Sequence, residues 1–378
     1  MNRVYQKTLG TSPYHRRKTG LLHDLHLDAS LLILLLVLST LGVIILMSAG
    51  YEDLALQQRQ VTRLGVAFFA MLIVAQIPPN ALKLFTPWLF FAGILLLVGV
   101  LFIGDMGKGA QRWLDLGFFR FQPSELLKLA TPMMVAWYFA ERRLPPRFKH
   151  IAIATLFIAI PSALIAKQPD LGTAILIAGS GLTVLFLAGI SWRLIASVIA
   201  AFTALAPALW YVMKDYQKQR VLTFLSPEAD PLGAGYHIIQ SKIAIGSGGL
   251  YGKGWMHGSQ ARLEFLPESS TDFIFAVFSE EFGLLGCIGL LSIYFLIFLR
   301  AIYIATQAQD TFSKLLAGSL SMTFFIYLFV NVGMVTGILP VVGVPLPLVS
   351  YGGTSMVTLL IGFGILMSIH THRKLLSS

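Results

Sequence analysis

A long uncharged stretch, SLLILLLVLSTLGVIILMSA at residues 30–49, indicates the class of this chain. A helix rises about 1.5 Å per residue, so a stretch of this length reaches across the roughly 30 Å hydrocarbon core of a bilayer. The segment before it is basic and polar and has no small-residue cleavage site after a short apolar core. The sequence therefore predicts a membrane-spanning helix that is not removed as a signal peptide.

Similar apolar runs recur along the whole chain. Of its 378 residues, 56% are hydrophobic and only 12% are charged, whereas about a quarter of residues are charged in soluble domains. The mean hydropathy is +0.74. We expect an all-α polytopic membrane protein with about ten transmembrane helices, at residues 30–49, 61–77, 84–103, 124–140, 151–166, 172–189, 194–213, 273–299, 315–337 and 348–370.

Positive charge is unevenly distributed between the predicted loops. Lys and Arg concentrate in the N-terminal tail, in segments 141–149 and 300–314, and near the C-terminus, which all lie on one side of the bilayer. The positive-inside rule then predicts cytoplasmic termini. This topology explains the net charge of +10. Nucleic-acid binding is rejected, because it calls for basic and aromatic residues alternating on one face.

The predicted topology divides the chain into five parts. A cytoplasmic tail (1–29) precedes seven helices (30–213), a large periplasmic loop (214–271), three helices (272–370) and a cytoplasmic tail (371–378). A second long outer segment, 104–123, lies between two spans. Because long segments gather on the outer side, we expect the functional site there.

The sequence predicts neither a disulfide nor a metal site. The single cysteine, Cys287, lies inside an apolar span and has no intramolecular partner. Cysteine-based structural zinc is therefore excluded, and the eight histidines show no HExxH or similar metal-ligand spacing.

The large outer loop contains a short amphipathic pattern at residues 236–244, which predicts a helix lying along the membrane surface. A glycine-rich run ends it. This run fails the test for a phosphate-binding loop, because the Walker pattern needs glycine where Ser247 stands and Ser or Thr where Gly254 stands. A flexible turn is the better interpretation.

Carboxylates crowd the point where this loop enters the next apolar run. Asp272 stands at the start of the span, and Glu280 and Glu281 follow about two turns further in. A charge at the edge of a membrane segment is costly to desolvate and by default indicates a functional site. The structural alternative is that Thr271 or Asp272 caps the helix that follows. At least one of the two glutamates should face the protein interior.

Two further pairs of charged residues lie next to predicted turns. Pro123 fits the first turn of a helix and Ser124 a capping position, which places Glu125 and Lys128 on one face at a spacing that allows an ion pair. Such a pair is either functional or a neutralised lock between helices. Lys167 and Asp170 flank an abrupt turn, where snorkelling and capping are the alternatives to binding a charged headgroup.

Isolated loop cations and a proline-broken segment complete the candidates. Arg220 and Lys242 are cations of the type that bind a diphosphate, although each is equally explained as a solvated loop residue. Segment 340–355 combines three prolines with a small polar cluster that includes Ser350. Irregular backbone of this kind either lines a cavity or permits close helix packing.

Six motifs in this order resemble the SEDS family (shape, elongation, division and sporulation proteins) over nearly the whole chain. They are GAQRW (109–113), QPSE (122–125), QPDLG (168–172), TDFIF (271–275), EExG (280–283) and PxxSYGG (347–353). Within that family, DPLGAGYHIIQSK (230–242) and the IHTHRK ending (369–374) are similar to the rod-shape branch of Gram-negative bacteria.

The resemblance implies a ten-helix glycosyltransferase of the bacterial inner membrane that polymerises lipid II on the periplasmic side. It also implies a class B penicillin-binding protein as partner, together with the elongation proteins MreB, MreC and MreD and membrane lipids. The family's key acidic residue falls on Asp272, with supporting positions at Arg112, Glu125, Lys128 and Lys242. As substrate-binding candidates we add Lys167, Asp170, Arg220, Glu280 and Ser350.

The implied chemistry makes Asp272 the general base for glycosyl transfer. The leaving group is already a diphosphate, so the reaction depends on charge stabilisation by Arg, Lys or a divalent cation such as Mg²⁺ or Mn²⁺. The motifs themselves demand no cofactor. The alternatives are a flippase that moves lipid II across the bilayer, a noncatalytic scaffold for wall-building proteins, and a division-specific polymerase of the same family.

Overall fold

The computed structural model describes residues 25–50, 53–107, 110–115, 117, 120–213, 215–226, 234–263, 265–266 and 268–373. Each predicted span overlaps a helix, although the last one, 348–370, begins six residues before its helix. These helices are α2 (Ala29–Ala49), α3 (Leu54–Ala75), α4 (Pro79–Ile103), α5 (Pro123–Ala140), α6 (Phe148–Lys167), α7 (Leu171–Leu187), α8 (Trp192–Val212), α12 (Ile274–Thr306), α13 (Thr311–Val335) and α14 (Thr354–Thr371).

Six of the described helices, α2, α4, α6, α12, α13 and α14, are long and apolar enough to cross a membrane, and α7 and α8 are shorter apolar helices. Helix α3 begins before the predicted apolar run, because the carboxylate of Asp53 caps it by accepting hydrogen bonds from the amides of Ala55 and Leu56. The protein is thus an all-α polytopic membrane protein, as the sequence predicted.

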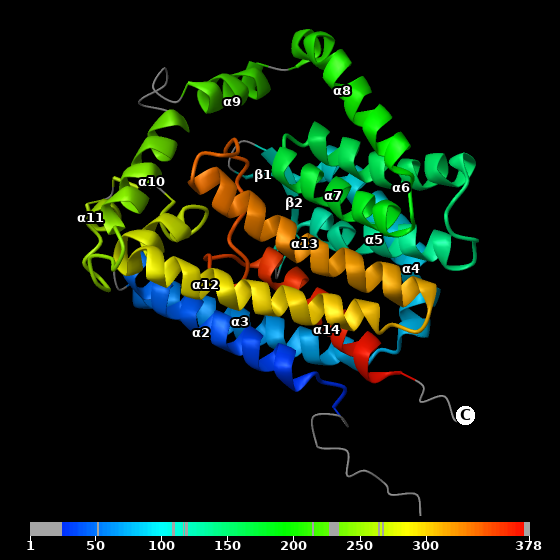
Figure 1. The fold of residues 1–378 in the computed structure, drawn as a ribbon, viewed down its shortest axis with the longest axis horizontal. Coiled ribbons are helices and arrows are strands. Elements are labelled where there is room, and N and C mark those ends of the chain that lie inside the picture. The colour runs from blue at the N-terminus through cyan, green and yellow to red at the C-terminus, as the bar shows by residue number, and fades with distance from the viewer. Residues whose placement is uncertain are drawn as a thin grey trace, which may run out of the picture.

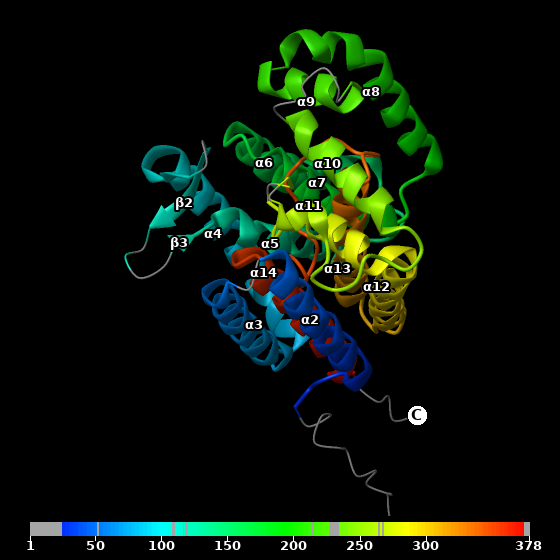
Figure 2. The ribbon, with the colours of Figure 1, turned by 90° about the vertical axis from the view of Figure 1, so that its left-hand side faces the viewer.

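The long helices run roughly side by side in a bundle (Figure 1). Helix α13 packs against α12, α7 and α5, and α14 packs along α3. Helix α8 stands away from this bundle and leads through α9 to α10, as the turned view also shows (Figure 2). The central position of α13 allows it to contact both the α5 side and the α12 side of the molecule.

The two predicted outer segments contain strands and helices beyond those that the sequence indicated. Segment 104–123 forms a small antiparallel sheet in the order β1-β2-β3, with β1 at Asp105–Gly107, β2 at Ala110–Asp115 and β3 at Arg120–Phe121. The large loop carries α9 (Asp215–Leu225), α10 (Ala234–Gly248) and α11 (Ser259–Arg262). The amphipathic pattern therefore does mark a helix, α10, which is tied to the end of α13 by a hydrogen bond from the Ser241 hydroxyl to the Val335 carbonyl (2.8 Å).

Helix α12 is interrupted at Gly283, whose φ of 62° is left-handed. The segment after α10 pairs with the interruption. The amides of Leu284 and Leu285 donate to the carbonyls of Gly249 and Leu250 (2.9 and 3.1 Å), and the Gly254 amide donates to the Glu281 carbonyl (3.0 Å). The loop thus satisfies backbone groups that an unbroken helix would satisfy itself.

The two ends of the described chain meet at the end of the bundle away from α10 and α11 (Figure 1). The His26 and His372 rings stack at 3.9 Å.

Asp28 caps α2 through the Leu31 amide and binds Arg300 of α12 through both carboxylate oxygens (2.5 and 3.1 Å). Burial alone would raise the pKa of Asp28, but hydrogen bonds from His370, Arg300 and Leu31 outweigh it and hold the pKa well below its usual range. The carboxylate therefore stays ionised in the folded protein as the pH falls through the ordinary carboxyl range. Its contribution to stability is full above that range and declines as the pH falls below it, because the unfolded chain then takes up the proton.

We expect Asp28→Asn to destabilise the protein by roughly 2–3 kcal/mol, because a buried carboxylate is lost and the Arg300 guanidinium keeps no counter-charge from it. Thermal unfolding of the purified protein in detergent measures the effect. The matched control is Asp53→Asn, which likewise caps a helix but is exposed. Asparagine caps as well as aspartate, so equal melting temperatures for the two variants would contradict the role assigned to the Asp28–Arg300 pair.

Candidate functional site

Asp272 lies in the turn just before α12 and is half-buried. A methyl group built on Gly343 would lie 3.5 Å from its Oδ2 atom, so segment 336–353 passes directly beside the carboxylate. The structure contradicts the alternative in which Thr271 or Asp272 caps the helix. The N-cap position is Phe273, without a side-chain hydrogen bond, and the Thr271 hydroxyl donates to Glu268 instead.

The turn around Asp272 is held from two sides. The Ser350 hydroxyl donates to the Thr271 carbonyl (2.6 Å) and accepts from the Leu346 amide (2.8 Å). The Asn331 amide donates to the Asp272 carbonyl (2.9 Å). Ser350 is thus buried and engaged with backbone groups, so it supports the site from within the protein.

One ring also packs next to Asp272. His237 of α10 stacks on Phe273, with ring centroids 5.7 Å apart. Burial lowers the pKa of His237, although Glu268 pulls in the opposite direction. The imidazole is therefore neutral at physiological pH.

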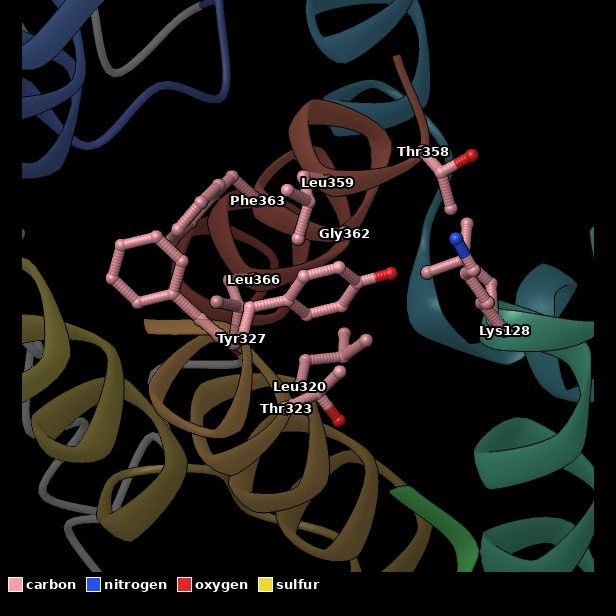
Figure 3. A pocket seen from close by; sticks show the side chains of 11 residues that line it. Lys128, Leu320, Thr323, Tyr327, Thr358, Leu359, Gly362, Phe363 and Leu366 are labelled. Atoms are coloured by element: carbon pink, nitrogen blue, oxygen red, sulfur yellow. The ribbon is translucent and has the colours of Figure 1, made fainter. Parts of the chain in front are cut away.

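Glu125 and Lys128 form the predicted ion pair on α5, with Nζ and Oε1 2.8 Å apart and both side chains buried. The Lys128 ammonium also lies 5.6 Å from the ring centre of Tyr327 on α13. Figure 3 shows the Tyr327 hydroxyl and the ammonium pointing toward one another, with Thr358 of α14 nearby. Pro123 occupies the first turn of α5 as predicted, whereas Gln122, not Ser124, is at the N-cap position.

The turn between α6 and α7 brings Arg112 and Asp170 together. Arg112 donates from Nη2 to the Pro169 carbonyl (2.8 Å), and its Nε lies 3.7 Å from the Asp170 carboxylate. Asp170 caps α7 through the Thr173 amide (3.2 Å), which confirms the capping alternative.

Lys167 is exposed at the end of α6. A methyl on Gly172 would lie 2.5 Å from the Val342 carbonyl, so this turn packs against the segment beside Asp272.

A groove of about 1160 Å³ lies between α3, α5, α14 and the small sheet. Three arginines line it, Arg63, Arg112 and Arg120, together with Glu125. The rest of its wall is mostly apolar or aromatic: Val66, Trp113, Phe121, Leu126, Leu129, Tyr351, Val357 and Ile361. The Tyr351 amide donates to the Ser270 carbonyl (2.8 Å), so one wall of the groove is bonded to the turn that carries Asp272.

Both glutamates of the EExG motif are buried, as predicted for at least one of them. The Glu280 carboxylate accepts from Lys253 Nζ (2.6 Å) and from the amides of Ser259 and Gln260 (2.9 and 3.1 Å). Glu281 accepts from the Ser48 hydroxyl. The described donors to Glu280 all come from the protein, so this residue anchors the 253–260 segment. Its contact with substrate stays a prediction.

Of the two predicted loop cations, the structure describes the side chain of Lys242 but not that of Arg220. Lys242 of α10 is exposed and lies over the end of α13, where a methyl on Gly337 would meet its Nζ at 2.8 Å. The side chain therefore reaches the start of segment 336–353. Arg220 lies in α9, but its side chain is outside the described part of the structure.

Three polar residues of the site were not predicted from the sequence. Gln60 and Asn331 are fully buried, and Arg63 stacks on Tyr351 with its guanidinium 4.7 Å from the ring centre. Arg63 could have been found, because an arginine near the start of an apolar span is a functional signal. Among the described residues, no group of three or more His, Cys, Asp or Glu is arranged to hold a metal ion.

Comparison with known proteins places the chain among wall-building membrane proteins. A family model described as cell cycle protein (FtsW, RodA and SpoVE) matches residues 28–375. The peptidoglycan glycosyltransferase MrdB of Escherichia coli is 54% identical over 353 residues, which are 93% of this chain and 95% of MrdB.

Two solved structures share the fold. A chain of a peptidoglycan synthase complex, reported for its coordination of polymerization and crosslinking, is 33% identical with a TM-score of 0.79, over 91% of this chain and 97% of that chain. The rod shape determining protein RodA of Thermus thermophilus is 28% identical with a TM-score of 0.70, over 92% and 98%. The motif resemblance is thus confirmed, and the chain belongs to the FtsW/RodA/SpoVE family, also called SEDS.

Proposed function

We propose that this chain, a peptidoglycan glycosyltransferase, polymerises lipid II with Asp272 as the general base. The observation that carries the proposal is the groove, which combines three arginines with a long apolar wall and is bonded through Tyr351 to the turn that carries Asp272. A polyprenyl diphosphate needs both features, cations for its phosphates and apolar surface for its chain.

In the proposed reaction, the 4-hydroxyl of the acceptor GlcNAc attacks the anomeric carbon of the donor MurNAc. The bond from that carbon to the diphosphate oxygen breaks, undecaprenyl diphosphate leaves, and the hydroxyl proton passes to the Asp272 carboxylate. Attack from the opposite face inverts the anomeric centre and gives a β-1,4 link. Arg63, Arg112 and Arg120 stabilise the negative charge that develops on the leaving diphosphate.

The Glu125–Lys128 pair lies at the inner side of this groove, since Glu125 lines it and Lys128 is bonded to Glu125. Removing one partner would leave an uncompensated buried charge. We assign the pair the role of holding α5 at a fixed distance from Tyr327 of α13. We place Arg112, Asp170 and Lys242 around the periplasmic end of the proposed site. Lys167, Arg220, Glu280 and Ser350 remain proposed contacts of the substrate.

The proposed setting is the bacterial inner membrane, with cytoplasmic termini, the 214–271 segment in the periplasm and the polymerase acting in cell-wall elongation. The stacked His26 and His372 rings support placing both ends on one side, and the distribution of Lys and Arg supports the cytoplasmic side. The partner we propose is a class B penicillin-binding protein, because a structural relative belongs to a complex that polymerises and crosslinks. We propose MreB, MreC and MreD as further members of that complex.

We expect Asp272→Asn to lower the initial rate of lipid II polymerisation by about 10²- to 10⁴-fold, because the proton acceptor is lost. The measurement is glycan-chain formation by the purified full chain with lipid II. Thermal unfolding serves as the control, and it should be unchanged because Asp272 does not cap α12. A variant that polymerised at the normal rate would remove Asp272 from the mechanism, and wild-type protein that moved lipid II without forming polymer would favour the flippase.

We expect Arg63→Gln to raise the KM for lipid II and to lower kcat, together reducing kcat/KM about tenfold or more. One charge-assisted contact to the bound diphosphate is lost, and the charge that develops on the leaving group loses the same partner in the transition state. The matched control is Arg142→Gln. Arg142 makes the same kind of stack, on Tyr138 with 3.7 Å to the ring centre, but does not line the groove. Equal kinetics for the two variants would show that the groove is not the diphosphate site.

A further inference from the structure

Asn331 is a fully buried amide on α13 that binds two main-chain carbonyls at once. Its Nδ2 atom donates to the Asp272 carbonyl at 2.9 Å and to the Val344 carbonyl at 2.7 Å. An amide nitrogen carries two hydrogens, so both are used. The opposite orientation would set Oδ1 against two carbonyl oxygens, and the direction of the side chain is therefore fixed by its partners.

The two carbonyls belong to the two segments that border the Asp272 carboxylate. One is the carbonyl of Asp272 itself, and the other follows Gly343, whose φ of 73° is left-handed. A methyl on Gly343 would lie 3.5 Å from Asp272 Oδ2. Asn331 thus joins the backbone of the base to the backbone of the wall beside it.

Asn331 does not hold the turn alone, because the Ser350 hydroxyl binds the preceding carbonyl, that of Thr271 (2.6 Å). Consecutive carbonyls are therefore fixed from two different elements. Loss of the Asn331 bonds would leave the turn attached through Ser350 while releasing the peptide that carries the Asp272 side chain. The result is a changed carboxylate position in a chain that still folds.

The Asn331 side chain is suited to fixing geometry, because its amide is one rigid planar group. Its two bonds therefore set the distance between the two backbone segments.

Asn331 also lies one turn after Tyr327 on the same face of α13. Tyr327 contacts Lys128, the partner of Glu125. The helix that positions the turn of Asp272 is thus the helix against which the buried ion pair rests.

We propose that Asn331 is a positioning residue that holds the Asp272 carboxylate in the orientation needed to accept the acceptor's hydroxyl proton. The inference rests on the proposed function, in which Asp272 is the base. It goes beyond that function by assigning the alignment of the base to a residue that touches neither the reacting atoms nor the groove.

The variants are Asn331→Asp, which keeps the shape but has no N–H donors, and Asn331→Ser, which keeps one donor. The control is Thr336→Val on the same helix, which removes a hydroxyl bonded only to the carbonyls of its own helix, those of Val332 and Gly333. Polymerisation by the purified full chain is measured against lipid II concentration. We expect Asn331→Asp to lower kcat about 10- to 100-fold with KM within about twofold, Asn331→Ser to fall between it and wild type, and Thr336→Val to match wild type.

A double-variant cycle separates positioning from a structural role. If Asn331 acts through Asp272, then Asn331→Asp lowers the residual rate of Asp272→Asn by less than twofold. An equal fold-loss in both backgrounds, a change confined to KM, or an unchanged kcat would each overturn the inference. If Asn331→Asp does not fold, Asn331→Ser is carried through the same cycle, and if the residual rate is too low to measure, the split between kcat and KM decides. Full activity of Asp272→Asn alone would instead contradict the proposed function.

Discussion

A buried backbone stretch without helix or strand needs hydrogen-bond partners from elsewhere in the protein, because no water or lipid supplies them. Segment 336–353 contains such a stretch, residues 344–350, all buried except Pro345. Its donors come from three different helices: Asn331 of α13 binds the Val344 carbonyl, Tyr294 of α12 binds Pro347 (2.6 Å), and Gln60 of α3 binds Ser350 (3.3 Å). The burial of these three polar side chains is thus explained by this one segment.

The same requirement explains why the site forms where it does. The segment that needs side-chain donors also borders Asp272, packs against the start of α7 and continues into the groove wall at Tyr351. Motifs far apart in the chain, QPDLG, TDFIF and PxxSYGG, are thereby brought together. The buried ion pair on α5 completes the arrangement from the opposite side, through Tyr327.

The spans and the existence of two long connecting segments, 104–123 and 214–271, could be predicted, because apolar runs and polar loops leave a signal in composition that needs no knowledge of contacts. The ion pair of Glu125 and Lys128 was also predictable, since its two residues are separated by one helical turn. The roles of Gln60 and Asn331 were not, because Gln60 binds a carbonyl 290 residues away and Asn331 binds carbonyls 59 and 13 residues away, all outside their own helices. A single amide in an apolar span has no periodicity that distinguishes it from any other polar residue. The small sheet was missed for a related reason, as its strands are too short to show alternation.

The interruption at Gly283 has a thermodynamic consequence for the part of α12 that follows Asp272. Residues 274–282 form a short block, and its junction with the rest of the helix is completed by the 249–254 segment. The block therefore cannot change its tilt without exchanging the hydrogen bonds of that segment. Any change in the tilt of the block is thus linked to a change in the hydrogen bonds of the 249–254 segment, so a molecule that favoured one arrangement of that segment would favour the matching tilt by the same free energy.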